Sequence, residues 1–195
     1  MATIRLYMTM SLDGYVTGPQ DSMENPMGIG GFRLFNWLDR RNDPGPSGQV
    51  HAEAMATRAV ISGRRTYEHA GPLAGRPSRR GPDLHPDPRC SGRPAAGERR
   101  YVTDVHECAA QAREAAGDGD VLVHGAGAAQ ALLRAGQLDE LELHVVPVLL
   151  GQGRRLFDDL PAQHVELDLV RRLTTPQGEN FAQHVTHMRY RVRRP

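Results

Sequence analysis

Short apolar runs alternate with amphipathic stretches along most of the chain, and their order predicts an α/β fold. The runs typical of strands are 4–10, 59–62, 101–103, 121–123 and 141–150. The stretches typical of helices are 32–38, 50–57, 67–70, 107–116 and 128–135. Two last strand-like stretches, 165–174 and 181–192, flank a Pro-Gln-Gly turn and predict an antiparallel pair. We therefore expect a mixed, mostly parallel sheet with helices on both faces and an antiparallel closing pair.

Loops interrupt this pattern in three places. Residues 18–31 and 42–48 are rich in Gly, Pro, Asn and Asp, which is typical of loops. Residues 71–100 form a longer irregular segment with many Gly, Pro and Arg and almost no apolar pattern. Four prolines within 77–90 make a central strand implausible there.

Length and composition narrow the class of protein. The 195 residues suit one domain, 1–195, that includes the irregular segment. A net charge of +1 gives no general attraction to nucleic acid or membranes, and no apolar run approaches the roughly 20 residues that span a bilayer. No signal-peptide pattern opens the chain, and Cys90 and Cys108 lack metal or redox spacing, so a cytoplasmic location is expected. All 24 basic residues are Arg, which excludes lysine chemistry.

Two segments share one local design, an apolar strand followed by a Gly turn and a helix. The first runs from Val60 to Thr66 and the second from Leu122 to Gln130. Unpaired N–H groups at the start of a helix bind phosphate, and small residues let the backbone approach it. Arg64, Arg65 and Thr66 would add side-chain donors. Ligands of open α/β sheets gather outside the carboxyl ends of the strands, so two such turns side by side would suit a dinucleotide.

Neither turn is diagnostic on its own. Gly-Ala-Gly also occurs where a strand turns tightly into a helix and binds nothing. Both segments lack the G-x-G-x-x-G pattern of Rossmann domains, and no acidic residue follows at the expected distance. On the residues alone, a structural and a phosphate-binding interpretation both stay open.

Other side chains predict packing or surface roles first. His184 and His187 would face opposite sides of a strand, and no cluster has ligand spacing, so no metal site is expected. The arginines from 189 to 194 are typical of a solvated strand face, and no nucleic-acid partner is expected. Phe32, Phe35 and Trp37 suit core packing or a dimer contact as well as a lid that stacks on a ring.

Three motifs, taken in order, resemble a known family. They are Thr9–Tyr15 (TMSLDGY), Gly63–Glu68 (GRRTYE) and Val121–Phe157, which ends in PVLLGQGRRLF. Their order and spacing resemble the stand-alone form of the reductase domain of bacterial riboflavin biosynthesis, over residues 4–157. The resemblance implies a dihydrofolate-reductase-like fold with three layers, NADPH as cofactor, a small-molecule substrate and a homodimer.

The resemblance also implies roles for individual residues. Asp13 would be catalytic, orienting substrate N–H groups or relaying a proton, although an Asp before Gly also forms turns. Gly14, Gly30 and Gly31 would border the substrate, together with the rest of the 28–31 loop. The residues expected to contact the cofactor are Met10, Ser11, Gly63, Arg64, Arg65, Thr66, Gly125, Ala126, Gly127, Ala128 and Gln130.

One segment departs from the family. Where 77–90 stands, the family has an apolar strand whose end helps to bind the adenosine phosphate. Two hypotheses remain: a genuine variable loop, or a local shift of reading frame that is restored near Gly97. If the strand were missing, NADPH binding would weaken, so a non-catalytic dimeric protein of the same fold is an alternative. Dihydrofolate reduction is a third, although the chain lacks a Trp-x-x-Pro-x-Asp pattern for a pterin-binding acid.

Overall fold

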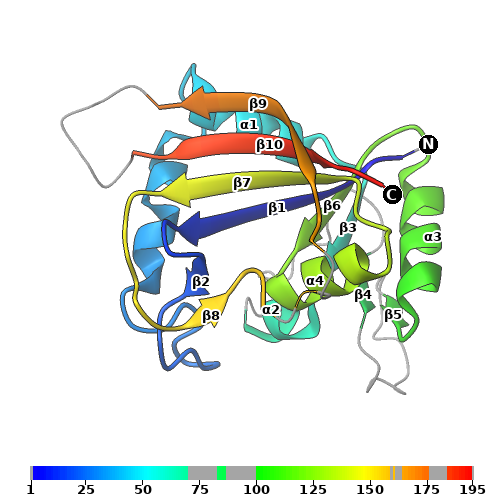
Figure 1. Ribbon diagram of the computed structural model, residues 1–195, viewed down its shortest axis with the longest axis horizontal. Helices are drawn as coiled ribbons and strands as arrows, with labels where there is room; N and C mark the ends of the chain where they lie inside the picture. Colours follow the sequence, from blue (N-terminus) through cyan, green and yellow to red (C-terminus); the bar gives the residue numbers. More distant parts are fainter. Residues whose placement is uncertain are drawn as a thin grey trace.

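The computed structural model describes residues 2–69, 83–86, 100–158, 160, 164–175 and 184–194, and places eight strands in one sheet. These strands are β1 (Ile4–Ser11), β3 (Ala59–Ser62), β4 (Asp83–Pro86), β5 (Arg100–Val102), β6 (Val121–His124), β7 (Glu140–Val146), β9 (Leu167–Thr174) and β10 (Thr186–Val192). Their spatial order is β5-β4-β3-β6-β1-β7-β10-β9 (Figure 1). The first six are parallel, whereas β10 is antiparallel to both β7 and β9. The predicted mixed sheet and its closing pair are confirmed.

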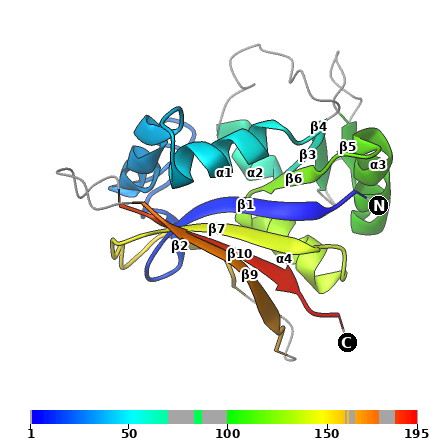
Figure 2. The ribbon, with the colours of Figure 1, turned by 90° about the horizontal axis from the view of Figure 1, so that it is seen from above.

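Helices lie on both faces of this sheet (Figure 2). The 3-10 helix η1 (Gly31–Arg40) and helix α1 (Pro46–Met55) lie on one face, and α3 (Val105–Ala116) and α4 (Ala126–Arg134) lie on the other. The short helix α2 (Arg64–His69) follows β3. A separate antiparallel pair, β2 (Tyr15–Thr17) with β8 (Arg154–Arg155), lies beyond the end of β1. None of the helices in the described ranges is long and apolar enough to cross a membrane.

Alternation along β1 explains the layers. Ile4 and Leu6 are fully buried in an apolar core that also includes Leu132 of α4. Tyr7 of β1 points to the other side of the sheet and packs against a second, smaller core that includes Trp37 of η1 and Val50 of α1. Both faces of the sheet carry apolar side chains, and helices pack on each face to bury them. This arrangement agrees with the predicted alternation of strands and helices.

Several boundaries differ from those expected. β7 ends at Val146 instead of residue 150, because Pro147 has no N–H to continue the ladder. The expected 42–48 loop is wrong from residue 46 onward, since Pro46 opens α1 at a position where proline is favoured. Helices α2 and α4 begin directly after Gly63 and Gly125, two or three residues earlier than expected.

The expectation that 77–90 cannot contribute a strand is wrong for residues 83–86. The backbone of β4 pairs in parallel with β3 on one side and β5 on the other. Pro86 is its last residue, where a missing donor disturbs the ladder least. The rest of 77–90, and with it the reading-frame hypothesis, lies outside the described residues.

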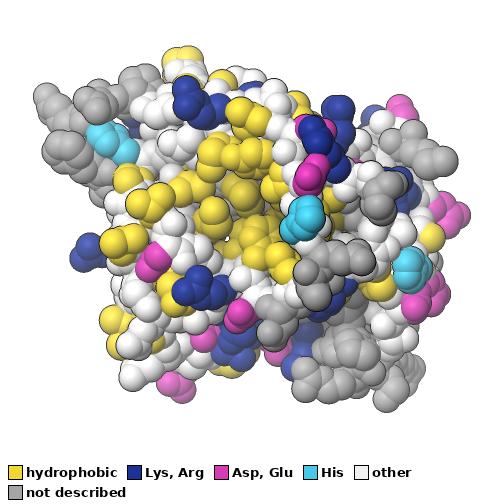
Figure 3. Space-filling view, viewed as in Figure 1, with side chains coloured by type: hydrophobic (Ala, Val, Ile, Leu, Met, Phe, Trp, Pro, Cys, Tyr) yellow, Lys and Arg dark blue, Asp and Glu magenta, His cyan; other side chains and the backbone are white. Residues whose placement is uncertain are grey.

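Apolar side chains also gather over β1, β7 and β10 on the face that carries α4 (Figure 3). Leu143 of β7 stands there between Met8 and Met188 of the adjacent strands. At the edge of the sheet, Leu169 and Val170 of β9 are 58% and 46% exposed. This apolar face is available for the expected homodimer, which stays a prediction.

Candidate functional site

The carboxyl ends of β1, β3, β6 and β7 lie at one edge of the sheet (Figure 1). Ser62, the last residue of β3, is in register with His124, the last residue of β6. The two Gly turns that follow are therefore neighbours, and the N–H of Gly63 donates to the carbonyl of His124 (3.0 Å). The predicted side-by-side arrangement of the two turns is confirmed.

Gly125 is where the two turns meet. Its φ of 98° lies in the left-handed region, and a Cβ at this position would clash with Thr66 Oγ1 of α2. Gly127, in the first turn of α4, instead faces open space, with nothing within 4 Å of an added Cβ. A ligand phosphate can therefore approach the backbone closely at Gly127, whereas the space beside Gly125 is filled by Thr66.

The other α4 residues predicted to contact the cofactor have structural partners. The methyl groups of Ala126 and Ala128 are buried in the core beneath the helix. The side-chain amide of Gln130 donates to the carbonyl of Leu156 (2.9 Å). These three side chains are therefore engaged within the protein, and the backbone groups of this turn are the candidates for contact with a phosphate.

Both arginines of the first turn also have partners. Arg64 lies 3.8 Å from Glu68, one helical turn away. Arg65 donates from Nε to Asp21 Oδ2 (2.9 Å) and from its terminal nitrogen to the Asp21 carbonyl (3.0 Å). The interaction joins α2 to the loop that follows β2, forty-four residues earlier in the chain.

Asp13 anchors the turn after β1. The hydroxyl of fully buried Ser11 donates to its Oδ1 (2.5 Å), and the N–H groups of Leu150 and Gly151 donate to Oδ1 (3.1 Å) and Oδ2 (2.7 Å). The Ser11 hydroxyl is the largest influence and lowers the pKa of Asp13. Burial, the next largest, raises it, but the backbone donors Gly151 and Leu150 lower it further, so the pKa falls overall. The carboxylate is thus ionised at neutral pH and suited to accept hydrogen bonds.

The predicted substrate-side glycines lie close to this anchor. Gly30 directly precedes η1 with a φ of 76°, and a Cβ there would lie 4.0 Å from Leu150 Cδ2. A Cβ on Gly31 would lie 2.9 Å from the backbone nitrogen of Gly18. The structure therefore brings Gly30, Gly31 and Asp13 to the same loop cluster. Met10 and Ser11 are consecutive on β1, so their side chains point to opposite faces of the sheet.

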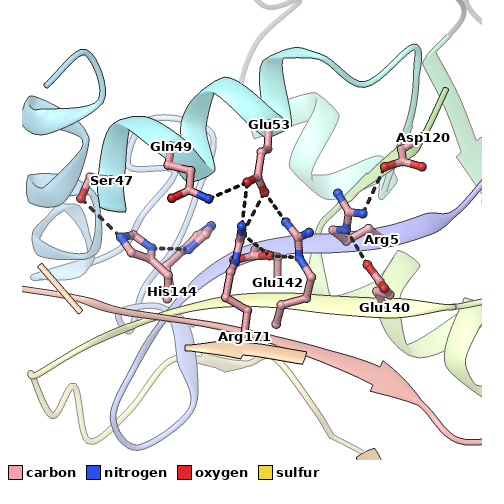
Figure 4. Close-up of polar contacts among 11 residues, drawn as sticks. Arg5, Ser47, Gln49, Glu53, Asp120, Glu140, Glu142, His144 and Arg171 are labelled. Atoms are coloured by element: carbon pink, nitrogen blue, oxygen red, sulfur yellow. Dashed lines mark hydrogen bonds and ion pairs between the residues drawn. The ribbon is translucent and has the colours of Figure 1, made fainter. Parts of the chain in front are cut away.

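A layer of polar side chains lies between α1 and the sheet (Figure 4). This layer was not predicted from the sequence. The Nδ1 atoms of His144 on β7 and His187 on β10 lie 2.8 Å apart, and Ser47 of α1 lies 3.3 Å from His187 Nε2. Both imidazoles are fully buried, and Trp37 packs against each of them. Burial, then the neighbouring His187, lowers the pKa of His144, and burial followed by Arg171 lowers that of His187 to about 4.

Beside the histidines, two acids bind two arginines. Glu142 of β7 is 1% exposed and contacts Arg171 (3.2 Å) and Arg189. Glu53 of α1 binds the same arginines, with 2.6 Å to Arg171. Burial opposes ionisation of Glu53, but Arg171, Gln49 and Arg189 outweigh it and lower its pKa to about 2. The sequence offers one sign of this network: charged residues such as Glu142 stand within strands that are otherwise largely apolar.

Metal and thiol chemistry find no support in the described ranges. No three of their His, Cys, Asp and Glu side chains form a group that could hold a metal ion. Cys108 is buried in α3, and burial raises the pKa of its thiol to about 12. A cavity of about 210 Å³ opens near the β9–β10 ends, lined by Leu12, Val145, Pro147, Thr174, Thr175, His184, Val185 and Thr186. It includes none of the predicted site residues, so we assign no substrate to it.

Comparison with known proteins agrees with this geometry. Residues 102–179 match the family model of the RibD C-terminal domain. The RibD C-terminal match confirms the predicted resemblance over that part of the chain. The protein YwjB of Bacillus subtilis (strain 168), itself described as uncharacterized, is 28% identical over 165 residues, which cover 80% of this chain and 82% of YwjB.

Two solved structures share the fold. A Shewanella sp. PV-4 protein provisionally assigned to riboflavin biosynthesis matches with a TM-score of 0.69 at 21% identity, over 100% of both chains. Dihydrofolate reductase from Enterococcus faecalis, complexed with NADP(H), matches with a TM-score of 0.62 at 12% identity, over 97% of this chain and 96% of that one. The fold is therefore dihydrofolate-reductase-like, and with the RibD match it supports a reductase-type function.

Proposed function

We propose that this chain is an NADPH-dependent reductase that transfers hydride to a small heteroaromatic or carbonyl compound. The observation that carries the proposal is the contact between the Gly63 and Gly125 turns at the ends of adjacent parallel strands. Two adjoining turns with little side-chain bulk suit the phosphates of a dinucleotide. The RibD C-terminal match supports the reaction type, and the dihydrofolate-reductase-like fold supports the cofactor class.

The residues present suit the cofactor in part. Gly127 is open, and a Cβ on Gly63 would meet nothing closer than 3.6 Å, so backbone can approach a phosphate at both places. The first N–H groups of α4 have no partner within the helix and can donate to it. Arg65 supplies a guanidinium group once it leaves Asp21.

NADPH, when bound, supplies the hydride, and the chain's own residues orient the substrate beside it. Among the described residues, Asp13 Oδ2 accepts a hydrogen bond from the Gly151 N–H, and this oxygen retains capacity to accept a substrate N–H. With its lowered pKa, Asp13 is a poor proton donor at neutral pH, so we propose that it orients the substrate instead of protonating it. Gly30, where an added Cβ would meet nothing closer than 4.0 Å, would leave room for the substrate ring, whereas Gly31 packs against Gly18 and would shape the loop beside it.

The test is calorimetric titration of the purified chain with NADPH, repeated on Gly127→Asp. An aspartate there meets open space and is favoured in the first turn of a helix, so the fold should be kept. Its charge should repel phosphate and weaken NADPH binding at least tenfold, on the order of one like-charge contact. His106→Asp is the matched control, because it adds the same charge to the first turn of α3.

Micromolar NADPH binding that Gly127→Asp weakens and His106→Asp leaves unchanged would support the reductase and justify a substrate screen. Binding that both variants weaken equally would contradict the placement of the phosphates at this turn. If the folded wild-type chain bound no NADPH at millimolar concentration, the non-catalytic alternative would replace the proposal.

A further inference from the structure

The Asp21 carboxylate joins three segments beside the candidate site: its own loop, α2 and β8. Its Oδ2 lies 2.8 Å from a terminal nitrogen of Arg65 on α2 and 3.4 Å from one of Arg154 on β8. Asp21 is only 14% exposed, whereas the two arginines are 47% and 44% exposed. One shielded anion therefore holds two arginine side chains that solvent, or a ligand, can still reach.

The loop that carries Asp21 is held at its base. The N–H of Gly18 donates to the Met27 carbonyl (2.8 Å), and the N–H of Ile29 donates to the Pro19 carbonyl (2.9 Å). A Cβ on Gly18 would clash with the Ile29 carbonyl, so the two ends of the loop are in backbone contact. We call residues 18–29 the Asp21 loop. Its closed base places Asp21 in a defined position instead of leaving it on a free segment.

Arg154 is held in a similar way. Gly153 packs so closely on the end of β2 that a Cβ there would clash with the Thr17 carbonyl. The N–H of Arg154 donates to Thr17 Oγ1 (3.3 Å). Arg154 is thus held at the end of β2, where the Asp21 loop also begins, whereas Arg65 reaches Asp21 from α2.

A carboxylate and a phosphate offer arginine the same chemistry, two or more anionic oxygens that accept charged hydrogen bonds. Arg65 lies two residues after Gly63, at the turn where the proposed function places the cofactor phosphates. In the chain without ligand, Asp21 occupies the guanidinium group that such a phosphate would need. Burial raises the pKa of Asp21, but Arg65 and Arg154 outweigh it and lower the pKa overall, so the competing group is an anion at neutral pH.

We propose that Asp21 is a specificity-determining residue of the site, an internal anion that a phosphate group of the ligand displaces from Arg65 and Arg154. The proposal rests on the proposed function for the identity of the ligand, but its chemistry requires only a phosphate. Displacement frees the Asp21 loop from α2, so that phosphate binding and loop release are coupled. A compound without a phosphate leaves this contact in place, so the competition with Asp21 acts only on ligands that carry one.

The experiment compares wild type with Asp21→Asn by calorimetry, using NADPH, NADH and inorganic pyrophosphate as probes. Asparagine keeps the size of the side chain but not the charge, so phosphate no longer competes with an ion pair. Two partly exposed ion pairs are removed, and the affinity for NADPH and pyrophosphate should rise about two- to tenfold. A gain with NADPH and pyrophosphate but not NADH would assign the effect to the additional phosphate of NADPH.

Three further variants separate competition from a general effect on the fold. Arg65→Gln and Arg154→Gln should each weaken binding, and Asp21→Asn combined with Arg65→Gln should lose the gain. Asp118→Asn is the matched control, since Asp118 pairs with Arg58 away from the site and should leave the affinities unchanged. Melting temperatures of all variants show whether each is folded.

Unchanged or weaker pyrophosphate binding by folded Asp21→Asn would overturn the proposal, as would absence of pyrophosphate binding to both proteins. Failure of the proposed function has a different result. In that case wild type binds no NADPH, yet Asp21→Asn still tightens pyrophosphate binding. NADPH binding that Asp21→Asn does not alter would leave the reductase standing and overturn the competition.

Discussion

The buried histidine pair predicts that acid destabilises this protein well above the pH at which carboxylates protonate. His187 has a pKa of about 4 in the folded chain, against 6.5 in an unfolded one. Because the folded pKa is depressed, the unfolded chain binds more protons between these values, and stability falls as pH falls. The loss begins below about pH 6.5 and continues until the folded form itself protonates near pH 4.

The magnitude follows from the two pKa values. Between pH 7.5 and pH 5, the depressed pKa of His187 lowers the free energy of unfolding by about 2 kcal/mol. His144 acts in the same direction, because burial and the neighbouring His187 lower its pKa as well. Glu53, with a pKa of about 2, is stabilising above the unfolded value of 4.5, and its contribution is lost only below that pH.

Urea unfolding at pH 7.5, 6 and 5, followed by the fluorescence of Trp37, measures this dependence. The indole is 1% exposed and its ring centre lies 5.0 Å from that of His187, so it reports on the same layer. His187→Asn should reduce the drop in unfolding free energy by about 2 kcal/mol. His106→Asn, on the exposed side of α3, should leave the drop as in wild type. Equal pH dependence in wild type and folded His187→Asn would refute the reasoning.

Three substitutions test other parts of the structure by the free energy of urea unfolding. Glu142→Gln should cost about 3–5 kcal/mol, because two arginines lose a buried anion, and a cost below about 1 kcal/mol would show that they find other partners. Trp37→Phe removes the N–H that donates to Thr9 Oγ1 (3.1 Å) and should cost about 1–3 kcal/mol; stability equal to wild type would contradict that bond. Gly125→Ala should cost about 1–3 kcal/mol from its positive φ and its clash with Thr66, and a neutral effect would disprove the close contact of the two turns.

Local patterns made most strands and both Gly turns predictable. A strand such as Val121–His124, buried along nearly its whole length and followed by glycine, has few other interpretations. The adjacency of Gly63 and Gly125 followed from general rules for parallel sheets, since the carboxyl ends of parallel strands share an edge. β4 was missed because its prolines dominate the composition, whereas strand pairing depends only on where a proline stands in the ladder.

The polar layer and the site's internal partners could not be predicted in the same way. Glu53 and Arg171 are 118 residues apart, and their contact depends on the register of three strands and the placement of α1 over them. The pairing of Arg65 with Asp21 likewise depends on how two loops meet. Sequence identifies a guanidinium group beside a Gly turn, but only the fold shows which anion already holds it.

The predicted site residues fall into two kinds, according to the partner that each one binds in the free chain. Gln130 binds the carbonyl of Leu156, just after β8, and Asp13 binds the N–H of Gly151, in the loop before β8. A ligand that displaced either residue would also disturb the segment that it holds. Arg65 instead binds a carboxylate through a half-exposed side chain, and exposed ion pairs are weak enough to be exchanged for a phosphate. The cofactor contact inferred for Arg65 is therefore compatible with the contact that it makes in the free chain. Gln130 uses its amide nitrogen to hold the segment after β8 in place, so a cofactor contact through that nitrogen would break this bond.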